Sequence, residues 1–301
     1  MKAVIFPGQG SQSVGMGKDI YDLAKDTIDA GNSALGFSLS KIMFEGPEED
    51  LRSTKYTQPA LLLHSIALWR LIADKVKPAY FAGHSLGEYT ALTAAGGISL
   101  EEALKAVHNR GKFMQEAVPM GVGGMLAVLG STDADVEAVC REVSTADSII
   151  EPANYNSDGQ IVVAGHLSSV DRFTEAMKAK GAKRVVPLPV SAPFHCSLMM
   201  PAQLKMASYL DNMTFNTLHT PVVNNVDAVV ETAPDVVKDA LVRQMSGAVR
   251  WTQVVKTLIG LGVTEFIEVG AGSVLSGLIK KIDKNISCVN ISSKEDLEKI
   301  I

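Results

Sequence analysis

Several features are scarce in this 301-residue chain, and each scarcity excludes a class of protein. Cysteine occurs only three times and never as a CxxC pair, so neither a disulfide framework nor a zinc site is indicated. The longest apolar run, residues 61–73, is interrupted by His64, Ser65 and Arg70. A membrane helix needs about 20 apolar residues. We therefore expect no metal site and no membrane span.

Basic residues are also few, with 28 Lys and Arg against 33 Asp and Glu, which gives a net charge of −5. Nucleic-acid-binding domains usually carry a basic excess, so no nucleic-acid partner is expected. The apolar stretch at residues 3–6 ends at Pro7 and is too short for a secretion signal. Together with the unpaired cysteines, this predicts a cytoplasmic protein in a reducing compartment.

Short apolar strands alternate with amphipathic helices over the first 120 residues. Thr57 and Pro59 indicate the start of one helix, and Ser99 with Glu102 forms a capping box at the start of another. Gly96 ends a further helix, which lies between these two in the sequence. The expected strands are 3–6 and 79–84, and the expected helices are 58–76, 86–95 and 99–118. This alternation predicts a mainly parallel sheet covered on both faces.

A different order follows between residues 124 and 190. Strand, helix, strand, strand, helix and strand succeed one another there, the order of a ferredoxin-like unit. After Ser191 the earlier alternation returns, with strands expected in 222–226, 265–269 and 287–292. We predict one large α/β domain, residues 1–123 and 191–301, with a small ferredoxin-like subdomain, 124–190, inserted in it.

The segment GHSLG has the pattern of a nucleophile elbow and falls between an expected strand and an expected helix. Such a tight turn leaves little room for side chains at Gly83 and Gly87, and it exposes the hydroxyl of Ser85 in a cleft. A serine that only caps the helix is the alternative. The elbow favours an α/β-hydrolase-like large domain with Ser85 as a nucleophile.

A nucleophilic serine needs a base, and elimination among the six histidines leaves His195. His64 lies in an apolar helix, and alternation along the strand points His84 to the opposite face. His108 lies outside the apolar stripe of its helix. His166 belongs to the small domain, and His219 is expected on the surface. No acid lies within ten residues of His195, so a backbone carbonyl could hold the ring instead. Cys196 is adjacent to His195, and adjacent side chains rarely face one another, so it is rejected as a nucleophile.

Two further positions suggest how a substrate is held. Leu86 follows the nucleophile, and Gln9 lies in a glycine-rich turn after the first strand, so their N–H groups are candidates for an oxyanion hole. Arg110 interrupts the apolar stripe of its helix, and a buried cation must meet an anion or carbonyls. Its partner is either an internal carboxylate or the carboxylate of a substrate.

One glycine-rich loop is a decoy. The segment GAGSVLSG at 270–277 follows an expected strand, but Leu275 stands where a dinucleotide-binding loop has its third glycine. We predict a tight core turn there.

Seven features of the sequence together resemble the malonyl-CoA:acyl-carrier-protein transacylase family over residues 6–282. They are FPGQGSQ, TQPAL, GHSLGEY, Arg110, NYNSDGQIVVAG, SAPFH and VRWTQVV, in this order. The resemblance implies that Ser85 carries the acyl group and that His195 is its partner. It further implies oxyanion donors at Gln9 and Leu86, and a malonyl carboxylate on Arg110.

The same resemblance implies roles for five more residues. Gln58 would line the site, the main-chain carbonyl of Gln244 would orient His195, and Phe194 with Leu86 would crowd an α-methyl group. Asn154 and Asn156 would shape the wall of the cleft between the domains.

The implied reaction is ping-pong transfer from malonyl-CoA, without a bound cofactor, to an acidic acyl carrier protein. Lys183, Arg184, Lys280 and Lys281 are candidates for a basic docking patch. We expect a monomer, although no sequence feature reports on the oligomeric state. A serine esterase and a non-catalytic carrier-binding module are the rival hypotheses.

Overall fold

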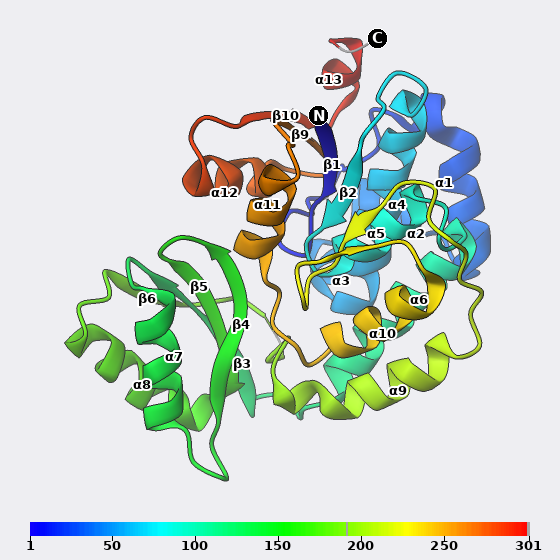
Figure 1. Ribbon diagram of the computed structural model, residues 1–301. Helices are drawn as coiled ribbons and strands as arrows, with labels where there is room; N and C mark the ends of the chain where they lie inside the picture. Colours follow the sequence, from blue (N-terminus) through cyan, green and yellow to red (C-terminus); the bar gives the residue numbers. More distant parts are fainter. Residues whose placement is uncertain (191, 300–301) are drawn as a thin grey trace.

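The protein, in a computed structural model that describes residues 1–190 and 192–299, contains two separate β-sheets (Figure 1). The larger sheet has the order β10-β9-β1-β2-β7-β8, and all its pairs are parallel except β7 with β8. Its strands are β1 (Lys2–Phe6), β2 (Tyr80–Gly83), β7 (Val222–Val223), β8 (Val230–Glu231), β9 (Glu265–Val269) and β10 (Ser287–Ile291). The predicted mainly parallel sheet is confirmed.

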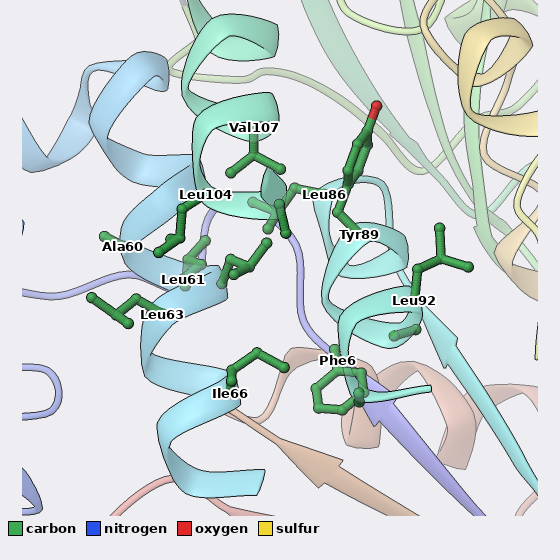
Figure 2. Close-up of a cluster of buried hydrophobic side chains, with 14 of the residues drawn as sticks. Phe6, Ala60, Leu61, Leu63, Ile66, Leu86, Tyr89, Leu92, Leu104 and Val107 are labelled. Carbon is green, nitrogen blue, oxygen red and sulfur yellow. The ribbon is translucent and has the colours of Figure 1, made fainter. Parts of the chain in front are cut away.

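Helices cover both faces of this sheet. Side chains alternate along β1, so Val4 and Phe6 enter one hydrophobic core while Ala3 and Ile5 enter another. Figure 2 shows part of the first core, which combines Phe6 of β1 with side chains from α4, α5 and α6. The helices that contribute to the first core include α1 (Tyr21–Leu35), α2 (Leu39–Glu45), α3 (Glu48–Arg52), α4 (Thr54–Ile72), α5 (Leu86–Ala94), α6 (Leu100–Glu116), α9 (Met200–Leu210), α10 (Pro234–Gln244) and α13 (Lys294–Glu298). The second core lies against α11 (Trp251–Gly260) and α12 (Val274–Ile282).

The smaller sheet is antiparallel, with the order β4-β5-β3-β6. Its strands are β3 (Gly123–Leu129), β4 (Ile150–Ser157), β5 (Gln160–His166) and β6 (Arg184–Pro187), and α7 (Asp133–Val143) and α8 (Leu167–Ala179) share its core. Figure 1 shows this unit beside the larger sheet, with the chain entering and leaving it near α9. The ferredoxin-like order of elements is confirmed. The division at 124 and 190 stays a prediction, and Ser191 lies outside the described residues.

The helix predicted to begin after Thr57 begins earlier, at Thr54, so that Pro59 lies inside it. Proline has no N–H and leaves the carbonyl four residues back without its helical donor. That carbonyl, on Lys55, lies 2.7 Å from Nδ1 of His108 on the neighbouring helix α6. Thr57 does not cap the helix, because its hydroxyl donates to the carbonyl of Leu51. The proline is tolerated here because a tertiary contact replaces the lost bond.

The strand predicted at 222–226 is shorter, since β7 ends at Val223. Asn224 and Asn225 leave the strand, and their amides turn to other partners: Asn224 Nδ2 donates to Glu231, and Asn225 Nδ2 donates to the carbonyl of Gly83. The second of these contacts ties β7 to the turn after β2.

The segment 270–277, predicted as a tight core turn, is a turn only at residues 270–273, because α12 begins at Val274; Gly270 and Ala271 are buried, whereas Gly272 and Ser273 are exposed. The buried carboxylate of Glu268 accepts hydrogen bonds from the N–H groups of Leu275 and Ser276 at the start of α12. A side chain of the protein therefore occupies the position that a phosphate would take. None of the helices in the described part of the chain combines the length and the apolar character that crossing a membrane requires.

Candidate active site

Ser85 lies on the turn between β2 and α5 in a strained backbone conformation. Its φ is +54°, in the region that non-glycine residues rarely adopt. A Cβ at Gly83 would collide with the carbonyl group of Gly87, and a Cβ at Gly87 would collide with the carbonyl oxygen of Phe6. These collisions explain why the motif has glycine at both positions, and they identify the turn as a nucleophile elbow.

His195 reaches the serine from the loop before η1 (Ser197–Met199). Its Nε2 lies 2.7 Å from Ser85 Oγ, and its Nδ1 lies 2.9 Å from the main-chain oxygen of Gln244. A carbonyl only accepts, so Nδ1 carries the proton and Nε2 is left to accept the serine proton. The carbonyl thus stands where a triad would have an acid, which accounts for the missing Asp or Glu.

The environment keeps the ring of His195 neutral. Burial, and then the nearby charge of Arg110, lower its pKa from 6.5 to about 3. A base with this pKa is in its active, unprotonated form throughout the neutral range, although its intrinsic basicity is reduced.

Because of this lowered pKa, we expect the rate of Ser85 acylation to stay nearly constant as the pH falls below neutrality. An ordinary histidine would lose about tenfold in kcat/KM for each pH unit below about 6.5, because its protonated form accepts nothing. Here the loss from this group begins only near its own pKa, so kcat/KM for malonyl-CoA should not fall on its account between about pH 5 and pH 8. A tenfold fall per unit below pH 6.5, in protein shown by circular dichroism to stay folded, would contradict the prediction.

Arg110, on α6, is almost completely buried, with 1% of its surface exposed. Its guanidinium donates to Gln58 Oε1 at 2.8 Å, to Gln244 Oε1 at 2.8 Å and to Ser85 Oγ at 3.0 Å. All three acceptors are neutral. Within residues 1–190 and 192–299 no carboxylate forms a direct ion pair with Arg110, although the buried Glu88 lies near enough to act on it electrostatically. The internal ion pair that was the alternative for Arg110 is therefore absent from the described structure. A buried cation beside the serine remains available for an anionic substrate group.

A cavity of about 110 Å³ opens over these groups. Its wall includes eight residues singled out from the sequence: Gln9, Gln58, Ser85, Leu86, Arg110, Asn154, Phe194 and His195. In the described chain the N–H groups of Gln9 and Leu86 have no main-chain acceptor outside regular helices and strands. Both are thus available to an oxyanion.

Asn156 differs from Asn154, because it is not among the residues that line the cavity. Its Oδ1 lies 2.9 Å from Nε2 of His84, whose ring packs against Trp251. His84 itself does line the cavity, although strand alternation placed it on the opposite face. The strand ends at Gly83, so alternation no longer applies at His84.

Beyond Leu86 and Phe194, the apolar part of the wall was not anticipated from the sequence. It is formed by Met114, Met125, Leu188 and Val190. Met114 belongs to the same apolar stripe as Arg110, which was the one available signal. The other three come from the small sheet and the segment after it, so only the packing of the two sheets reveals them.

Two other kinds of chemistry are not supported at this site. Burial raises the pKa of Cys196 to about 12, and its Sγ lies 3.2 Å from the carbonyl of Pro193, so it is no thiolate nucleophile. Among the residues that the structure describes, no cluster of three or more His, Cys, Asp or Glu side chains is arranged to hold a metal ion.

An α/β fold with a serine, a histidine and free N–H donors in one cavity is the arrangement of an acyl-transferring enzyme. The family model of the acyl transferase domain matches residues 4–296, so the class of the protein is acyltransferase. A curated relative, malonyl CoA-acyl carrier protein transacylase from Salmonella typhimurium, is 49% identical over 285 residues, covering 93% of this chain and 92% of the relative. One from Staphylococcus aureus is 44% identical over 299 residues, covering 98% and 97%.

Solved structures agree with these relatives. The acyl carrier protein S-malonyltransferase of Vibrio cholerae superposes with a TM-score of 0.97 at 44% identity, covering 100% of this chain and 99% of that one. A malonyl-transacylase solved in complex with a type II polyketide synthase acyl carrier protein has a TM-score of 0.96 at 42% identity, covering 99% and 98%. This chain belongs to the malonyl CoA-acyl carrier protein transacylase family.

Proposed function

We propose that this enzyme transfers the malonyl group of malonyl-CoA to the phosphopantetheine thiol of an acyl carrier protein, through an ester on Ser85. The observation that carries the proposal is the buried, positively charged Arg110, which has only neutral partners and donates to the same Ser85 Oγ that His195 contacts. A guanidinium in this position can hold a carboxylate close to the reacting oxygen. The names of the curated relatives support the same substrate pair.

The first half-reaction begins when Ser85 Oγ attacks the thioester carbonyl and its proton passes to Nε2 of His195. The N–H groups of Gln9 and Leu86 stabilise the oxyanion. The C–S bond then breaks, and the coenzyme A thiolate leaves with the proton from His195. In the second half-reaction the carrier thiol gives its proton to His195 and attacks the ester carbonyl. The bond between the acyl carbon and Ser85 Oγ then breaks, and Oγ takes the proton back from His195. No metal or bound cofactor takes part.

The shape of the site fits this substrate. A second cavity of about 380 Å³ shares Gln9, Leu188 and Val190 with the inner one, and we assign it to the extended arm of coenzyme A or of the carrier. Phe194 and Leu86 narrow the inner cavity next to Ser85, which disfavours an α-methyl group on the acyl chain.

The carrier protein would dock near the mouth of these cavities. Lys183, Arg184, Lys280 and Lys281 stay candidates for its contact surface, and Lys281 already donates to Gln160 in the free protein. A role in fatty-acid or polyketide synthesis and a cytoplasmic location belong to the same proposal.

Intact mass spectrometry tests the proposal directly. We expect one malonyl group per chain after incubation with malonyl-CoA, on the peptide that contains Ser85, because the ester forms before any acceptor is present. Addition of holo carrier protein should move the group to its thiol. Release of free malonate without transfer would support the esterase hypothesis, and no adduct at all would support a binding module.

A further inference from the structure

One buried carboxyl group beside the site has no part in the reaction described above. Glu88 lies on the first turn of α5, three residues after the nucleophile, and is completely buried. Its Oε2 accepts from Nε2 of Gln244 at 3.0 Å and from the main-chain N–H of Asn225 at 2.8 Å. Oε1 has no partner among the described residues. Because a carboxyl group is costly to bury, the presence of Glu88 at this buried position calls for an explanation.

Gln244 links Glu88 to Ser85, Arg110 and His195. Its Nε2 donates to Glu88 and to the carbonyl of Ser85, its Oε1 accepts from Arg110, and its main-chain oxygen lies against Nδ1 of His195. The two ends of an amide have opposite hydrogen-bonding roles. The acceptors at Glu88 and at the carbonyl of Ser85 therefore place the NH₂ group on their side, and this leaves Oε1 facing Arg110.

Asn225 links Glu88 to the elbow. The Oδ1 of Asn225 accepts from the N–H of Ser85 at 2.6 Å, and its Nδ2 donates to the carbonyl of Gly83 at 2.7 Å. The strained turn is thus clamped on both sides by one residue whose own N–H is held by Glu88.

We propose that Glu88 is a positioning residue for malonyl recognition, whose oxygen sets the orientation of the Gln244 amide and through it the aim of Arg110. The inference rests on the proposed function, because only a substrate with a carboxylate uses Arg110. Misorientation of Gln244 would turn an NH₂ group toward the guanidinium, and Arg110 would shift from the place where the carboxylate binds. An acetyl substrate makes no such contact, so it should be affected less.

The requirement is for an acceptor rather than for a charge. Burial, reinforced by the charge of Glu231, raises the pKa of Glu88 to about 8. A proton can reside on the partnerless Oε1 while Oε2 continues to accept. Glutamine should therefore replace Glu88, with its oxygen in place of Oε2 and its NH₂ group in place of Oε1.

Three variants test the proposal, with the ratio of kcat/KM for malonyl-CoA to kcat/KM for acetyl-CoA as the readout. Glu88→Met keeps the volume but accepts nothing, and should lower this ratio by about tenfold. Glu88→Gln should keep the ratio within about threefold of the wild type. Glu231→Met is the matched control, since Glu231 is also buried and accepts a hydrogen bond from Asn224, and within the described residues it has no hydrogen bond to Gln244 or Arg110. Its ratio should not change, whatever its stability.

Each other outcome overturns the proposal. An unchanged ratio in Glu88→Met, or an equal fall in Glu231→Met, would reduce Glu88 to a structural role. A fall in Glu88→Gln as large as in Glu88→Met would show that the charge matters. If Glu88→Met does not fold, Glu88→Asp, which withdraws the acceptor by one methylene, should lower the ratio in the same direction. Wild-type protein that forms no malonyl ester would instead refute the proposed function itself.

Discussion

Ser85→Ala is expected to lower kcat/KM for malonyl transfer by about four orders of magnitude or more, the usual result of removing a nucleophile that forms a covalent intermediate. Among the described residues, the Oγ of Ser85 is the one oxygen bonded to both His195 and Arg110, at 2.7 Å from Nε2 and 3.0 Å from the guanidinium. Alanine keeps the Cβ of serine, so the strain at φ +54° is unchanged and the variant should fold.

The measurement combines transfer kinetics with intact mass after incubation with malonyl-CoA. Ser208→Ala is a suitable control, because this exposed hydroxyl on α9 donates to the carbonyl of Leu204 in its own helix. It should retain both the rate and the adduct. An adduct of undiminished yield on Ser85→Ala would place the nucleophile elsewhere and remove the basis of the mechanism.

The fold could be predicted well where local pattern and packing agree. The apolar runs at 3–6 and 265–269 became neighbouring central strands, β1 and β9, because both faces of a parallel sheet are buried. The start of α4 was misplaced because proline usually marks a first turn, and only the contact between His108 and Lys55 shows why Pro59 is accepted within the helix. No expectation covered α1 to α3, between the first strand and that helix.

The site could be predicted as a set of motifs but not as a shape. Ser85 and His195 are 110 positions apart in the sequence, and Arg110 comes from a third element, yet one cavity holds all three. Each motif predicts its own local backbone, as GHSLG predicts the elbow at Ser85, but not the distances between side chains from different motifs. Glu88 belongs to the segment GHSLGEY, but the motif suggested no role for it, and Asn225 lies outside the seven features. Their importance arises from hydrogen bonds across elements that only folding brings together.

Arg110→Ala should reverse the substrate preference of the enzyme. Truncating one partner of a desolvated, charge-assisted pair costs about 3–5 kcal/mol, so kcat/KM for malonyl-CoA should fall by roughly two to four orders of magnitude. An acetyl group has no carboxylate to lose. The rate of acetyl transfer should rise relative to that of malonyl transfer, because the methyl group of the acetyl substrate then faces an enlarged and less polar cavity.

The comparison of both thioesters in one preparation separates recognition from folding, because any loss of folded protein lowers both rates equally. Arg70→Ala on α4, where the guanidinium donates to Thr27 at 3.1 Å, is the control and should leave the preference unchanged. An equal loss for malonyl-CoA and acetyl-CoA in Arg110→Ala would mean that this arginine only holds Gln58 and Gln244 in place. The esterase hypothesis would then become the better account, since nothing else in the described cavity selects for a negative charge.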